Sequence, residues 1–117
     1  MHQSKKKHKM KQSKINIEVN LDENNIPEKI SWQADDHPGD GWKDSKAVSI
    51  SIWDPEQQDS LSLELWTKDM NVDEMKRFYV NMFGAASNTI LNSTGDEFMA
   101  QEVKNLCEKL VEYLKFQ

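Results

Sequence analysis

The apolar residues of this chain change their spacing once, near residue 67. Before that point they recur at every second position, which is typical of strands with one buried face, and after it they recur every three or four positions, which is typical of amphipathic helices. Strands therefore precede helices. This order predicts an α+β fold, in which a four-stranded antiparallel sheet is followed by two helices packed on one of its faces.

Four segments carry the two-residue alternation, and they predict strands over residues 15–21, 29–34, 47–53 and 60–67. The first strand ends at residues 22–25, an Asp-Glu-Asn-Asn run that favours a turn. Residues 35–45 are polar and contain Pro38, Gly39 and Gly41, so we expect a loop there. Only residues 54–59 join the last two strands, which must be antiparallel because a parallel pair needs a far longer crossover.

The helical part has recognisable ends. Asn71 followed by Glu74 predicts a capping box at the start of the first helix, and Gly95 predicts its end in a left-handed conformation. Asp96 is then positioned to cap the second helix, whose apolar stripe is long enough to pack in this chain or against a second copy, so a homo-oligomer is left open.

Charge divides the chain into two regions. The 117 residues carry a net charge of -5, but residues 1–14 hold six lysines and no acid, a charge of +6, which leaves nine basic residues against 20 acids in residues 15–117, a charge of -11. The six are Lys5, Lys6, Lys7, Lys9, Lys11 and Lys14. We predict a disordered basic tail over residues 1–14, since it has almost no apolar residues to bury, and one α+β domain over residues 15–117.

The basic tail has two interpretations. It either binds RNA, an anionic lipid surface or an acidic partner through charge, or it is only a solvated terminus. No aromatic residue lies among the lysines, so bases cannot stack on this segment. Because lysine-rich arms attract phosphates without reading sequence, no specific nucleic-acid recognition is expected.

Four tryptophans are many for so short and hydrophilic a chain. We expect Trp32 in the core. The alternation places Trp53 and Trp66 on the sheet face opposite the leucines, among serines and Glu64, and it places Trp42 in the loop. Exposed aromatic side chains are enriched at the energetic centres of protein interfaces. Trp53, Trp66, Trp42 and Glu64 are therefore the candidate protein interface, unless the loop or the first strand covers this face.

Residues that could support chemistry are few. The acidic loop around His37 does not fit a calcium-binding loop, since Pro38 and Ala47 fall where oxygen ligands are required. Cys107 lies on an apolar helical stripe, which is typical of an unreactive structural cysteine. No phosphate-binding glycine loop or activated serine turn is present in the sequence. We expect no enzymatic activity, no metal site and no cofactor.

The compartment follows from two features. No apolar run approaches the roughly 20 residues that span a bilayer, and the basic N-terminal residues are not followed by the apolar region of a secretory signal. A single cysteine fits a reducing compartment. We expect a cytoplasmic protein that is not integral to a membrane.

Several segments together resemble the GldC family of gliding motility-associated proteins. The most specific is Leu65-Trp66-Thr67-Lys68-Asp69-Met70, which leads into Val72-Asp73-Glu74-Met75-Lys76. The others are residues 15–24, Ile26-Pro27-Glu28-Lys29-Ile30-Ser31-Trp32, Ser51-Ile52-Trp53-Asp54 and Thr94-Gly95-Asp96-Glu97. The lysine-rich extension before Ile15 and the form of the loop over residues 35–45 depart from the family pattern.

The resemblance implies a non-enzymatic accessory protein of bacterial surface gliding, with gliding or type IX secretion components as protein partners and no catalytic or ligand residues to carry over. Two alternatives stay open. The order of four strands and two helices is also similar to that of the export chaperone SecB, which suggests a chaperone for exported proteins by topology alone. The basic tail suggests a module that binds nucleic acid or a membrane surface.

Overall fold

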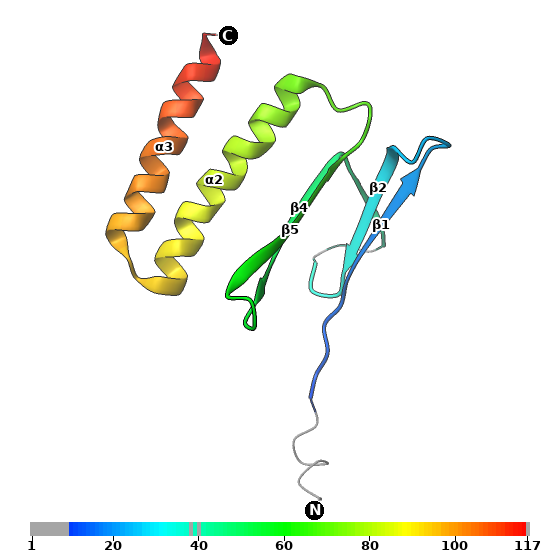
Figure 1. The fold of residues 1–117 in the computed structure, drawn as a ribbon, viewed down its shortest axis with the longest axis horizontal. Coiled ribbons are helices and arrows are strands. Elements are labelled where there is room, and N and C mark those ends of the chain that lie inside the picture. Colours follow the sequence, from blue (N-terminus) through cyan, green and yellow to red (C-terminus); the bar gives the residue numbers. More distant parts are fainter. Residues whose placement is uncertain (1–9, 38, 40, 117) are drawn as a thin grey trace, which may run out of the picture. The chain divides into compact units, whose positions relative to one another are not determined.

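The computed structural model describes residues 10–37, 39 and 41–116 (Figure 1). The chain divides after Asp69 into two compact units. The first unit holds β1 (Ile15–Leu21), β2 (Pro27–Ala34), β3 (Lys43–Ser45), β4 (Ala47–Asp54) and β5 (Asp59–Trp66). The second holds α2 (Val72–Thr94) and α3 (Glu97–Lys115). Strands therefore precede helices, as the periodicity predicts, and all strand pairs are antiparallel.

The strands form two sheets, β1-β2-β3 and β4-β5, so the prediction of one four-stranded sheet is wrong. The cause lies at Lys46. Residues 43–45 pair with β2, whereas the strand that starts at Ala47 pairs with β5. The change of partner splits what the alternation indicated as one sheet. It also shows that the last three residues of the predicted loop form a strand.

The turn between β1 and β2 is fixed by one side chain. Asp22 Oδ1 accepts hydrogen bonds from the backbone N–H groups of Asn24, at 2.8 Å, and Ile26, at 3.0 Å. Asn25 adopts a positive φ of 64°, a conformation that Asn tolerates better than most residues. The predicted turn at residues 22–25 is confirmed.

The core of the first unit centres on Ile30, which is fully buried. Ile30 lies opposite Val19 on β1 and opposite Ser45 on β3, so it is covered from both neighbouring strands. Trp32, expected in the core, is half-buried. Its ring meets that of His37 edge to face, with 4.6 Å between the ring centroids.

The hairpin of β4 and β5 pairs in one unbroken register from Ala47 opposite Trp66 to Asp54 opposite Asp59. Its tight turn is closed by the Gln58 N–H, which donates to Asp54 O at 2.9 Å, and Gln58 takes a positive φ of 55°. The alternation of side chains therefore gives this hairpin one aliphatic face and one serine-rich face along its whole length.

Both helices begin where the sequence indicates, and α2 also ends where it indicates. Asn71 Oδ1 accepts from the Glu74 N–H at 2.8 Å, while the Glu74 carboxylate accepts from the Asn71 N–H, which completes the capping box. Gly95 ends α2 in the left-handed conformation with φ 72°. Asp96 caps α3 by accepting from the Met99 N–H at 2.9 Å.

Small groups let α2 and α3 approach each other. Ser87 Oγ donates to Ala100 O at 2.8 Å, and both residues are buried. The Cys107 thiol contacts Val80 O at 3.5 Å. Neither helix in the described residues has the length and apolar character needed to cross a membrane. The packing of these helices on the sheet and the single domain over residues 15–117 stay predictions.

Candidate functional site

Trp53 and Trp66 lie on the serine-rich face of the β4–β5 hairpin, as the alternation predicts. The register places Trp53 opposite Ser60 and Trp66 opposite Ala47. Trp53 is 59% exposed and Trp66 is 46% exposed. Neither side chain is covered by the loop or by β1 to an extent that buries it, so both indole rings are available for contact in this structure.

The two tryptophans do not form one cluster within a chain. Six steps along the strands separate the pair formed by Trp53 and Ser60 from the pair formed by Ala47 and Trp66, which corresponds to about 20 Å at the usual rise per residue. Between them lie Ser49, Ser51, Ser62 and Glu64. The face is thus a polar strip with one aromatic ring at each end.

Glu64 is tied into this strip. The Ser49 hydroxyl donates to Glu64 Oε2 at 3.2 Å, and the hydroxyls of Ser51 and Ser62 lie 3.4 Å apart. These contacts cross from β4 to β5 at directly opposed positions. Cross-strand pairs of this kind orient polar side chains on a sheet surface, so the strip presents one ordered carboxylate among hydroxyls.

Trp42, the third candidate, precedes β3 and is 45% exposed. It lies outside the hairpin. The structure therefore does not bring Trp42 onto the strip through strand pairing, although all three tryptophans present a large part of their surface to solvent.

The opposite face of the hairpin is also exposed, which the sequence interpretation missed. Ile52, Leu61 and Leu63 each keep more than half of their surface accessible, whereas Val48, Ile50 and Leu65 are half-buried. An aliphatic row is normally assigned to the core.

The predicted basic arm is only partly described. Lys5, Lys6, Lys7 and Lys9 lie outside the described residues, while Lys11 and Lys14 are exposed. The chain is held to the loop after β2 at the end of this arm. Ser13 Oγ donates to Asp36 Oδ2 at 2.7 Å, and the Lys14 N–H donates to Asp35 Oδ2 at 3.0 Å.

Those two bonds give Asp35 and Asp36 a structural role. Within residues 10–37, 39 and 41–116, no group of three or more Asp, Glu, His or Cys side chains is arranged to hold a metal ion. His37 packs on Trp32 and donates its backbone N–H to Ala34 O at 3.2 Å. The contacts of this loop are thus those of a folded connection.

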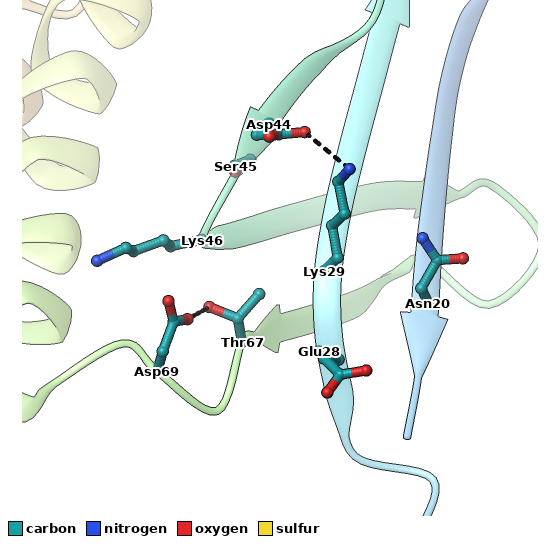
Figure 2. A pocket seen from close by; sticks show the side chains of 8 residues that line it. All are labelled: Asn20, Glu28, Lys29, Asp44, Ser45, Lys46, Thr67 and Asp69. Carbon is teal, nitrogen blue, oxygen red and sulfur yellow. Dashed lines mark hydrogen bonds and ion pairs between the residues drawn. The ribbon is translucent and has the colours of Figure 1, made fainter. Parts of the chain in front are cut away.

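A second polar region is an open depression of about 700 Å³ near the ends of β2 and β5. Figure 2 shows the eight side chains that line it, namely Asn20, Glu28, Lys29, Asp44, Ser45, Lys46, Thr67 and Asp69. Lys29 Nζ lies 3.8 Å from Asp44 Oδ1, and Thr67 Oγ1 donates to Asp69 Oδ1 at 2.5 Å (Figure 2). Three carboxylates and two lysines line it together, so it favours no one class of charged ligand.

The shifted pKa values near this depression have structural causes. The hydrogen bond from Thr67 lowers the pKa of Asp69, with a further contribution from the charge of Lys46. Hydrogen bonds from the Ile26 N–H and from Lys68 lower the pKa of Asp22. The contacts with Asp22 and Glu28 raise the pKa of Lys68. Each shift stabilises the charged form of its group, whereas a general acid or base needs a pKa near neutrality.

Residues 27–116 match the family model described as gliding motility-associated protein GldC-like. The matched segment begins at β2 and includes β3 to β5 and both helices. No significant match was found among curated proteins or among solved structures.

Proposed function

The chain belongs to the GldC-like family of gliding motility-associated proteins, and from that premise we propose that it is a non-enzymatic accessory protein of the gliding machinery that acts by binding other proteins. The proposed contact surface is the serine-rich strip of the β4–β5 hairpin, with Trp53 and Trp66 at its two ends. Components of the gliding or type IX secretion apparatus are the proposed partners, in the cytoplasm.

The exposure of Trp53 is the observation that supports this proposal. A tryptophan that is 59% exposed on a face of serines is held out of the core by the strand register. Burying such a ring in a partner gains a large apolar area, and tryptophan is over-represented among residues that dominate binding energy. The surrounding hydroxyls and Glu64 can satisfy polar groups at the rim.

The absence of enzymatic activity is part of the proposal. Asp22, Lys68 and Asp69, the groups with shifted pKa values, are engaged in a turn, an ion pair and a local hydrogen bond. These contacts explain the shifted pKa values of the three groups without a bound substrate. The large depression of Figure 2 is open and mixed in charge, whereas active sites usually enclose most of a ligand.

The experiment uses a matched pair of single substitutions at neighbouring positions. Trp53→Ser and Ile52→Ser each replace a side chain that is 59% exposed, but the two side chains lie on opposite faces of the hairpin. Each variant replaces the native gene in a gliding bacterium, and colony spreading and co-purified motility proteins are measured. Trp53→Ser, alone and combined with Trp66→Ser, should reduce both readouts.

The Ile52→Ser strain should spread and recover motility proteins as the native strain does. Normal spreading and normal recovery in the double tryptophan variant, with circular dichroism showing a native fold, would contradict the proposed surface. Normal spreading after deletion of the whole gene would contradict the motility role itself.

A further inference from the structure

The outer edge of β5 runs along eight residues and lacks several of the features that usually protect strand edges. Among the described residues, β5 pairs with β4 alone, and seven of its eight residues are exposed. Natural edge strands are usually protected by lysine, proline, a bulge or a covering element. Neither β4 nor β5 contains Lys or Pro, and their register has no shift.

A hairpin of two strands also needs further support to be stable. An isolated two-stranded sheet is marginally stable in water, and independent stability needs three or more strands with a common apolar face, or packing against a helix. Within the first unit, the apolar row of Ile52, Leu61 and Leu63 keeps more than half of its surface exposed. Additional strands beside β5 would extend that face into a continuous one.

We propose that the β5 edge pairs antiparallel with the β5 edge of a second copy of this chain, so that two hairpins form one four-stranded sheet around a twofold axis at Leu63. This proposal does not depend on the role in gliding. A second copy is the chosen occupant because the β5 sequence, Asp59-Ser60-Leu61-Ser62-Leu63-Glu64-Leu65-Trp66, is complementary to itself when one copy is reversed.

The register follows from the side chains. Pairing Leu63 with Leu63 of the second copy places Leu61 opposite Leu65, so only aliphatic groups meet on one face. On the other face, Ser62 comes to lie opposite Glu64, the same Ser–Glu pairing that Ser49 and Glu64 already form within the chain at 3.2 Å. No like charges are opposed. Sliding the copies by two residues in one direction would instead place Asp59 opposite Leu65, and a one-residue shift would bring opposite faces together.

The same register changes the tryptophan strip. Ser60, which pairs with Trp53 within the hairpin, would lie opposite Trp66 of the second copy. Trp53 of one copy and Trp66 of the second copy would then lie in one row across the sheet. They would be two strands apart, which is about 10 Å at the usual strand spacing. Rings that are far apart in one chain would therefore be grouped in two pairs across the dimer.

The first test uses single-cysteine variants of the full chain. In each of them Cys107→Ser removes the one native cysteine. Leu63→Cys would place two thiols directly opposite each other at the axis, within the separation that a disulfide allows. Ile52→Cys is the control, because it lies on the same aliphatic face with similar exposure but on β4.

Mild oxidation should link most of the Leu63→Cys protein into covalent dimers and leave Ile52→Cys largely monomeric. The native chain should show a concentration-dependent monomer–dimer equilibrium in analytical ultracentrifugation. A monomer at all concentrations, or cross-linking of Ile52→Cys instead of Leu63→Cys, would overturn the proposal. Binding of the β5 edge only to a strand from a different protein would also overturn the proposal.

The second test introduces a negative or a positive charge at the exposed position Ser62. Ser62→Glu places two carboxylates opposite each other twice per dimer, whereas Ser62→Lys places an ammonium group opposite Glu64. Directly opposed like charges destabilise strand pairs, so Ser62→Glu should weaken dimerisation on the order of tenfold and Ser62→Lys should leave it unchanged or tighter. Equal dimerisation of the two variants, or the reverse order, would contradict the register.

Discussion

Lys68 Nζ lies 3.0 Å from Asp22 Oδ2, and this contact joins the turn after β1 to the segment that leaves β5. The backbone repeats the connection, because the Lys68 N–H donates to Pro27 O at 3.0 Å. Lys68 also reaches Glu28 Oε1 at 3.3 Å. These contacts tie the β1-β2-β3 sheet to the end of the hairpin within the first unit.

Replacing Lys68 tests this connection. Lys68→Met keeps the length of the side chain but removes both ion pairs, so we expect a melting temperature a few degrees lower and faster amide exchange at the end of β5. Lys29→Met is the matched control, because the ion pair of Lys29 with Asp44 is longer, at 3.8 Å, and both side chains are exposed. Equal effects of the two substitutions in thermal melts would contradict a special role for Lys68.

Acid should weaken the same connection. The hydrogen bonds to Asp22 lower its pKa below the ordinary value of 3.8, so the unfolded chain binds the proton more readily than the folded one. The stabilisation is therefore fully present above about pH 4 and is lost as the pH falls through the lowered pKa. Urea unfolding between pH 7 and pH 2 measures it.

Asp22→Asn should be less stable than the native chain at pH 7 and should lose less stability between pH 5 and pH 2. The two proteins should therefore become more similar in acid. If the difference between them stays constant across this range, the charge of Asp22 is not what stabilises the turn.

The core should be sensitive at Ile30. Ile30→Ala removes a fully buried side chain, and such truncations cost about 3 kcal/mol. Ile15→Ala, at a position on β1 that is 75% exposed, should change the free energy of unfolding by less than about 0.5 kcal/mol. Denaturant titration of both variants checks the contrast, and similar losses would place the core elsewhere.

The first helix should depend on its cap. Asn71→Ala removes the side chain that accepts from the Glu74 N–H and should cost about 1 kcal/mol. Asn88→Ala is the control, because Asn88 is exposed within α2 and alanine favours a helix interior. The control should be as stable as the native chain or slightly more stable, and a loss there equal to that of Asn71→Ala would argue against a capping effect.

Local signals in the sequence predicted most of the elements. Alternation located the longer strands, and the caps at Asn71, Gly95 and Asp96 located the helix ends to within a residue. The sequence of β3 is Lys-Asp-Ser, which contains no apolar residue to indicate a strand. The split of the sheet was therefore not predicted. The pairing of β3 with β2 is a long-range contact that periodicity does not report.

The candidate surface was predicted in part. The face occupied by Trp53 and Trp66 follows from counting along a strand, but the exposure of the aliphatic row does not, because a pattern indicates which residues share a face and not what covers it. The bond between Asp22 and Lys68 spans 46 positions, and nothing local to either residue indicates it.

The change of strand partner at Lys46 also bears on the order of folding. All pairs between β4 and β5 form across a short turn, and such hairpins close within microseconds. Pairing of β3 with β2 must first close the longer connection between Ala34 and Lys43, which carries a larger entropic cost. The hairpin can therefore form early, and the attachment of Lys68 to Asp22 and Pro27 would be a late event that locks it to the rest of the first unit.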